Sequence, residues 1–210
     1  MDENKLNIIK PFGPAIAKVK MPEKIINALN DHVDKIVNNE ELSKKFDNGK
    51  YLAGNVKQEL SLSKEISEES GWSSFLANST RAWIKFCLGK NIKEFQIYSS
   101  WIVRQFSNEY NPVHWHSGHI SGAGFLKVPS TFGETFQKDK KNYNGKLVLI
   151  HGSRSFLCNS KYEIIPEVGD FYIFPHYLMH TVYPFKDTND ERRSISFNAK
   201  VDDEIFYEIF

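Results

Sequence analysis

From residue 94 onward, the sequence is a succession of short segments rich in β-branched and aromatic residues, separated by turn signals and without helical patterns between them. The longest candidate strand spans Glu94–Phe106. Further candidate strands are Gly122–Val128, Gly145–His151, Ser155–Cys158, Tyr162–Ile165, Phe171–Phe174, His180–Phe185, Arg193–Val201 and Glu204–Phe210. Many short strands without intervening helices are typical of a β-sandwich or a β-barrel. We therefore predict a mainly β core over residues 94–210.

The N-terminal part of the chain has a different pattern. Apolar residues at helical spacing predict one helix over residues 22–37, which begins at a proline, and a second over about residues 71–88, which Gly89 ends. The polar segment 38–70 reads as irregular. We expect residues 1–93 to form a helical and irregular region packed on the β core, so that the whole chain is one domain with flanking helices.

Composition excludes several classes of partner. The formal net charge of the 210-residue chain is +1, and no basic aromatic patch indicates nucleic acid binding. The sequence has no apolar leader and no apolar run of membrane-spanning length, so we predict a soluble, cytoplasmic protein without membrane contact. Cys87 and Cys158 are expected to be two buried free thiols, with a single disulfide as the alternative. The oligomeric state cannot be read from the sequence.

Three of the seven histidines lie within six residues, in the segment VHWHSGH. On a strand, the side chains of His114 and His116 leave the same face, where two imidazoles can bind one metal ion. Trp115 would point to the opposite face, into packing. A hydrogen-bonded surface pair is the alternative, because two ligands alone do not make a metal site.

A third candidate ligand, His180, opens a strand 64 residues after His116, which leaves room for several strands before the chain returns. Twelve residues after His180 comes Arg192, followed by Ser194. Under strict alternation, Arg192 and Ser194 share one strand face. This places a cation and a hydroxyl group on the same cavity as the metal.

The order of these residues matches the needs of a non-heme Fe(II) oxygenase. Such a site uses three protein ligands on one face of the metal and leaves other positions open. A 2-oxo acid can chelate two of the open positions. Its distal carboxylate then needs a buried counter-charge, and the guanidinium of Arg192 offers a bidentate match.

With this ordered set, the chain resembles the 2-oxoglutarate/Fe(II)-dependent oxygenases, and more narrowly the small "putative 2OG-Fe(II) oxygenase" family. The segments that carry the resemblance are His114-Trp115-His116, Ser121-Gly122, Gly169–Pro175, His180, Arg192-Arg193-Ser194 and Phe197-Asn198. The resemblance covers roughly residues 94–200. It implies a double-stranded β-helix, the jelly-roll and cupin-like fold, which agrees with the strand count above.

The resemblance also implies the activity. The protein would be a dioxygenase that uses Fe(II), 2-oxoglutarate and O2, hydroxylates a peptide or small-molecule substrate, and releases succinate and CO2. His114, His116 and His180 would bind the metal, while Arg192 and Ser194 would bind 2-oxoglutarate. No catalytic residue beyond the metal ligands is expected. The identity of the substrate cannot be read from the sequence.

One departure from the superfamily leaves alternatives open. The usual first motif is H-x-D/E, whereas this chain has His116 at the third position. A water molecule or His119 could take the third coordination position instead. Two other functions share these histidines: a non-catalytic, cupin-like jelly roll that binds a metal or a ligand, and a zinc hydrolase with three histidines and a water. The hydrolase would need a general base, and no Asp or Glu is adjacent to the cluster.

Some nearby side chains have two plausible roles. His151 could line the mouth of the pocket or lie on the surface, and His176 reads as a turn residue. Tyr98 and Trp101 could wall the 2-oxoglutarate pocket or belong to the core. Arg193 is expected to be a solvated charge that points outward.

Overall fold

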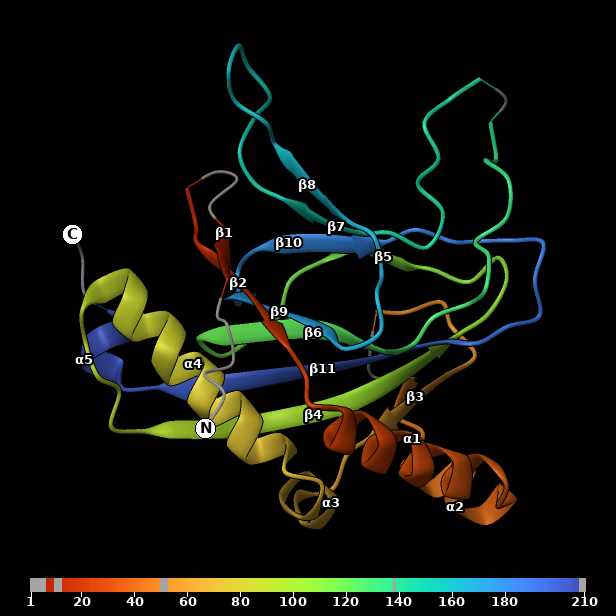
Figure 1. Cartoon of the computed structure of the whole chain (residues 1–210), viewed down its shortest axis with the longest axis horizontal. Coiled ribbons are helices and arrows are strands. Elements are labelled where there is room, and N and C mark those ends of the chain that lie inside the picture. The colour runs from red at the N-terminus through yellow and green to blue at the C-terminus, as the bar shows by residue number, and fades with distance from the viewer. Residues whose placement is uncertain (1–6, 10–12, 50–52, 138, 208–210) are drawn as a thin grey trace.

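The computed structural model describes residues 7–9, 13–49, 53–137 and 139–207. Two antiparallel sheets face each other, and helices cover the outer face of the larger one (Figure 1). The larger sheet contains, in spatial order, β1 (Asn7–Ile9), β2 (Ile16–Lys20), β9 (Asp170–Pro175), β6 (Ile120–Lys127), β11 (Arg192–Val201), β4 (Phe95–Gln105) and β3 (Gln58–Ser61). The smaller sheet contains β5 (Asn111–His114), β10 (Met179–Val182), β7 (Leu147–Ile150) and β8 (Lys161–Ile164). The predicted mainly β fold with flanking helices is confirmed.

The described helices are α1 (Glu23–Val37), α2 (Glu40–Phe46), α3 (Lys64–Glu69), α4 (Trp72–Leu88) and α5 (Asp203–Phe206). The two long helices lie where the periodicity predicts them. Gly89 ends α4 in the left-handed conformation (φ 70°), which a residue with a side chain adopts only at a cost in free energy. The N-terminal region also contributes β1, β2 and β3 to the larger sheet.

Alternation along the strands divides the core into two layers. One layer lies between the larger sheet and the helices, and it includes Trp72 of α4 together with Ile195 and Phe197 of β11. The other layer lies between the two sheets and includes Phe125 and Leu149. Because successive side chains of a strand point to opposite faces, β11 serves both layers.

Several local predictions were wrong. Segment 38–70, expected to be irregular, contains α2, β3 and α3, whose short lengths give little periodic signal. The side chains of Asn39 and Ser63 cap the two helices by accepting hydrogen bonds from backbone N–H groups. Ser155–Cys158 forms an isolated bridge instead of a strand.

The C-terminal strand predicted over Glu204–Phe210 is also absent from the described residues. Its first part lies in the helical turn α5, and residues 208–210 lie outside the described residues. The ring of Phe206 stacks on His119 at a centroid distance of 3.7 Å, so tertiary packing outweighs the strand-like composition.

Neither Cys87 nor Cys158 forms a disulfide, as predicted, but neither is buried: Cys87 is half-buried and Cys158 is exposed. Among the described residues, no helix combines the length and the apolar character needed to cross a bilayer.

Arg193, predicted to be a solvated outward charge, is buried at 2% exposure. It projects toward the helices, where α1 covers the sheet. Its guanidinium donates hydrogen bonds to Glu191 at 2.9 and 3.0 Å, to Asp34 of α1 at 2.7 Å and to the side chain of Asn30 at 3.0 Å. Glu191 also accepts from Arg104 at 2.8 Å. This network joins α1 to the larger sheet.

We predict that Arg193→Met lowers the free energy of unfolding by roughly 3 kcal/mol, because it leaves part of a buried charge network without its partner. Urea denaturation followed by circular dichroism measures the change. Arg81→Met, at an exposed position of α4, is the matched control and should change stability by less than about 0.5 kcal/mol. Equal losses in the two variants would contradict a stabilising role for the network.

Candidate metal centre

Three histidines converge between the two sheets. His114 ends β5 and lies directly opposite His180 on the neighbouring strand β10. His116 follows two residues after β5, and its backbone N–H donates to the carbonyl of His176 at 3.1 Å. One ring nitrogen from each histidine lies within 4.8 Å of the other two. The structure thus brings together the three residues that the sequence predicts as ligands.

Backbone carbonyls orient two of the rings. The Nδ1 atom of His114 lies 2.7 Å from the carbonyl oxygen of Pro112, and Nδ1 of His180 lies 2.9 Å from that of Leu178. A carbonyl oxygen can only accept, so Nδ1 carries the proton in both rings and Nε2 keeps a free lone pair. The lone pair of a neutral imidazole is the group that binds a metal ion.

Burial keeps the three rings neutral. It is the main cause that lowers the pKa of His116 to about 3 and that of His180 to about 4, and the neighbouring histidines lower both further. Burial also lowers the pKa of His114. The Nε2 atoms of His116 and His180 are 3.1 Å apart. Two adjacent ligands of one metal, each about 2.1 Å from it, have nitrogens about 3 Å apart, so this spacing suits a shared ion.

Arg192 is a buried cation without an anionic partner. Its Nη1 donates to Oε1 of Gln105 at 3.1 Å and to the hydroxyl of Ser194 at 3.3 Å, and its guanidinium lies 5.0 Å from the ring centre of Phe125. In the described part of the chain, no carboxylate pairs with it and its Nε has no hydrogen-bond partner. Burial lowers its pKa to about 9. A buried charge in this state favours an anionic ligand.

One cavity between the sheets connects the histidines with the arginine. Its lining comprises Trp101, Val103, Asn111, His114, His116, Ala123, Leu147, His180, Val182, Arg192, Ser194 and Ser196. All five residues predicted for metal and cosubstrate binding are among them. The free volume is about 30 Å³, roughly that of one water molecule, so a dicarboxylate requires the lining side chains to move.

Three of the other candidate residues, His119, His151 and Tyr98, are not in the described lining of this cavity. Nδ1 of His119 accepts from the backbone N–H of Val201 at 3.3 Å, and its ring stacks on Phe206, so it does not join the histidine cluster. His151 and Tyr98 are not among the described residues that line the cavity. Trp101 does line it, with its ring 5.4 Å from that of His116.

Trp115, predicted to be packed, is 64% exposed. It lies between two ligand candidates in the sequence but is not in the described lining of the cavity. The prediction failed because no described segment covers this part of the outer face of the smaller sheet. Alternation therefore places the tryptophan in solvent rather than in a core.

Sequence reasoning missed two polar residues near the cavity. Gln105, fully buried on β4, was visible as a polar residue on the strand face shared by Trp101 and Val103. Glu59 had no such signal, because β3 was not predicted. Its carboxyl hydrogen-bonds to the side chain of Asn111, and burial raises its pKa to about 7.

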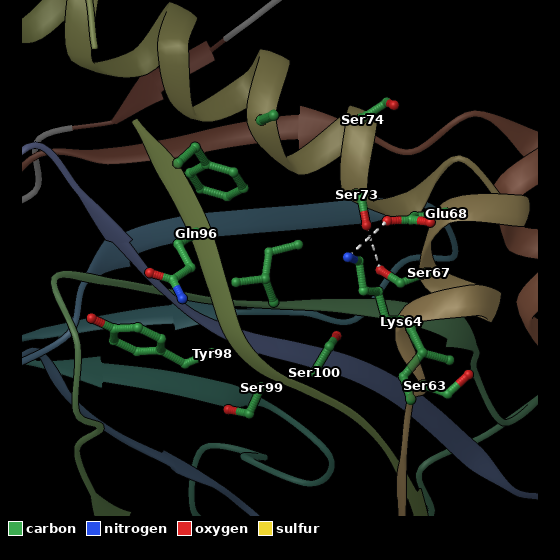
Figure 2. Close-up of a pocket in the computed structure, with 14 residues that line it drawn as sticks. Ser63, Lys64, Ser67, Glu68, Ser73, Ser74, Gln96, Tyr98, Ser99 and Ser100 are labelled. Carbon is green, nitrogen blue, oxygen red and sulfur yellow. Dashed lines mark hydrogen bonds and ion pairs between the residues drawn. The ribbon is translucent and has the colours of Figure 1, made fainter. Parts of the chain in front are cut away.

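A larger hollow lies away from this chemistry. It has a volume of about 720 Å³ and is lined by β4, α3 and α4, where Figure 2 shows serine hydroxyls gathered beside the Lys64–Glu68 pair. Its described lining contains no histidine and no arginine, so it lacks the residue types assigned above to the metal and the cosubstrate.

Comparison with known proteins agrees with the fold and the motif. A sequence model of the family described as "Putative 2OG-Fe(II) oxygenase" matches residues 99–198, which confirms the resemblance. No curated protein sequence matches the chain.

Solved structures share the fold at low sequence identity. A Pseudomonas putida prolyl-4-hydroxylase matches with a TM-score of 0.57 and 12% identity, covering 87% of this chain and 91% of that one. The viral collagen prolyl hydroxylase of Paramecium bursaria Chlorella virus 1, as a 2OG complex, gives 0.52 and 14%, covering 88% and 94%. HygX of Streptomyces hygroscopicus, with nickel and 2-oxoglutarate bound, gives 0.55 and 8%, covering 88% and 81%. The predicted double-stranded β-helix is thereby confirmed.

The raised pKa of Glu59 predicts a pH-dependent stability. Below pH 4.5 the group is protonated in both the folded and the unfolded state. Between pH 4.5 and about 7 the unfolded chain loses this proton while the folded protein keeps it, so stability falls as pH rises. We therefore compare the unfolding free energy of Glu59→Gln with that of the wild type at two pH values. Between pH 4.5 and pH 8 the difference should shift by roughly 3 kcal/mol in favour of the variant. A difference in unfolding free energy that does not vary with pH would contradict this assignment.

Proposed function

We propose, from the family match of residues 99–198 and the fold that they form, that the protein is an Fe(II)- and 2-oxoglutarate-dependent dioxygenase. One observation carries the proposal. Three neutral histidines line the same cavity as an arginine that pairs with no carboxylate of the described residues. A metal ion would satisfy the histidines, and a carboxylate of a dicarboxylate would satisfy the arginine.

The donor set fits Fe(II). Imidazole nitrogens suit iron, and three of them would leave coordination positions open. His114, His116 and His180 would hold the ion, and the carbonyls of Pro112 and Leu178 fix the orientation of the His114 and His180 rings. Because all three ligands are neutral, they cancel none of the metal's charge, which favours an anionic chelator.

The other end of the cavity fits the distal carboxylate of 2-oxoglutarate. Arg192 would bind it with its unpartnered Nε–H and its remaining N–H groups, and the hydroxyl of Ser194 would support it. The apolar side chains of Val103, Leu147 and Val182 in the lining would exclude water. When bound, Fe(II) and 2-oxoglutarate supply the O2-dependent oxidation, with succinate and CO2 as products.

We further propose that the reaction is a hydroxylation of a peptide or a small molecule. Support for both substrate classes comes from similar structures, which include prolyl hydroxylases and HygX with hygromycin B bound. A non-catalytic jelly roll would not need a buried arginine without a counter-ion. A zinc hydrolase would need a general base, and the described cavity lining contains no Asp or Glu.

Anaerobic titration tests the metal and the cosubstrate together. Adding Fe(II) and then 2-oxoglutarate to the metal-free protein should produce the weak visible charge-transfer band of a chelated 2-oxo acid. The band should be absent in His180→Ala, because the most buried ligand is lost. Tight metal binding without a band would favour the non-catalytic or zinc alternatives.

Arg192→Ala should weaken 2-oxoglutarate binding by about 100-fold while leaving the Fe(II) content unchanged, because a buried charge partner of the ligand is removed. The same titration measures the dissociation constant. Arg193→Met is a stringent control, since the neighbouring arginine points to the opposite face of β11. Equal effects of the two substitutions would remove Arg192 from the assignment.

A further inference from the structure

The side chain of Gln105 is fully buried beside the arginine of the cavity. Gln105 on β4 lies directly opposite Arg192 on β11, and its Oε1 accepts from Nη1 of Arg192 at 3.1 Å. It therefore touches the cation that would bind the cosubstrate, but it does not line the cavity in the described structure.

The orientation of this amide is determined by its other partners. Nε2 of Gln105 donates to the backbone carbonyl of Glu109 at 2.6 Å and lies 3.4 Å from that of Tyr183. Carbonyl oxygens can only accept, so the nitrogen must face them and the oxygen must face Arg192. If the amide were flipped, Oε1 would face the two backbone carbonyl oxygens and Nε2 would face Nη1 of Arg192. Acceptors would then meet acceptors, and a donor would meet a donor. The acceptor presented to Arg192 is thus fixed by the backbone.

Arg192 contacts a neutral acceptor, whereas two neighbouring arginines contact a carboxylate. Arg193 and Arg104 both form ion pairs with the carboxylate of Glu191. Arg192 instead contacts an amide and a hydroxyl, which satisfy part of its hydrogen-bonding capacity without cancelling its charge. A carboxylate at position 105 would supply the counter-ion from within the protein.

We propose that Gln105 is a positioning residue that holds the guanidinium of Arg192 in place and keeps its charge available for the distal carboxylate of the 2-oxo acid. The inference rests on the proposed function. It predicts that Gln105 determines selectivity for a dicarboxylate, while chelation at the metal is independent of it.

A pair of 2-oxo acids separates these two contributions. 2-Oxopentanoate has the same carbon chain and the same chelating group as 2-oxoglutarate but lacks the distal carboxylate. We take the ratio of the two dissociation constants, measured anaerobically with Fe(II) bound, as the selectivity. Gln105→Glu should lower the selectivity at least about tenfold, because the new carboxylate pairs with Arg192, and Gln105→Met should lower it by about tenfold, because the acceptor is lost. Binding of 2-oxopentanoate should stay unchanged in both.

Gln58→Glu is the matched control. Gln58 is also buried, and its Oε1 accepts from Nη1 of Arg104 at 3.0 Å, but neither residue of this pair is in the described lining of the cavity. The same change of charge beside an arginine should leave the selectivity at the wild-type value.

The outcomes distinguish the inference from its premise. Wild-type selectivity in both Gln105 variants would overturn the inference and leave the proposed function intact. Equal weakening of both acids would show that Gln105 is only structural, which also overturns it. A wild-type protein that binds neither acid, or shows no preference for the dicarboxylate, would overturn the proposed function and the inference with it.

Discussion

β11 is paired on both sides within the larger sheet, and its side chains alternate between the two faces of that sheet. This alternation determines where the charges of Arg192 and Arg193 lie. Arg192 and Arg193 are adjacent in sequence and equally buried, yet they point to opposite faces. On the helix side, Arg193 meets carboxylates from its own strand end and from α1, and this ion-pair network attaches the helix to the sheet. On the cavity side, Arg192 meets neutral acceptors. The pairing of β11 with β4 and β6 fixes both positions, so neither charge can relax into solvent.

The cavity combines the cationic side chain of Arg192 with three histidines that can bind a metal cation. Three neutral imidazoles lower none of the positive charge that a bound metal would add, and the described lining offers no acidic side chain. Burial makes an unpaired cation costly, and a ligand with two negative ends would offset that cost. As a ligand in place of a carboxylate, His116 would leave the charge of the metal uncancelled. This arrangement therefore favours a dicarboxylate chelator.

Patterns within one strand were predictable from the sequence, whereas contacts between elements were not. Alternation correctly grouped Arg192 with Ser194, and the spacing of the histidines correctly indicated that His180 returns beside His114. The same rule could not show that α1 covers Arg193 or that no described segment covers Trp115, because coverage depends on tertiary packing. Gln105 acquires its role through its register opposite Arg192, and a single sequence gives no register between strands that are 87 residues apart. The short elements of segment 38–70 are held by caps and by pairing with β4, which leave almost no periodic signal.

The burial of the five cavity residues differs between the two ends of the cavity. His180, Arg192 and Ser194 are buried, whereas His114 and His116 are half-buried, so the arginine end is the deeper part of the cavity. A dicarboxylate held by Arg192 would occupy the interior and leave the side of His114 and His116 for a substrate. Trp115, between these two histidines in the sequence, is 64% exposed and is not among the described residues that line the cavity, so its ring is not expected to contact a ligand held there.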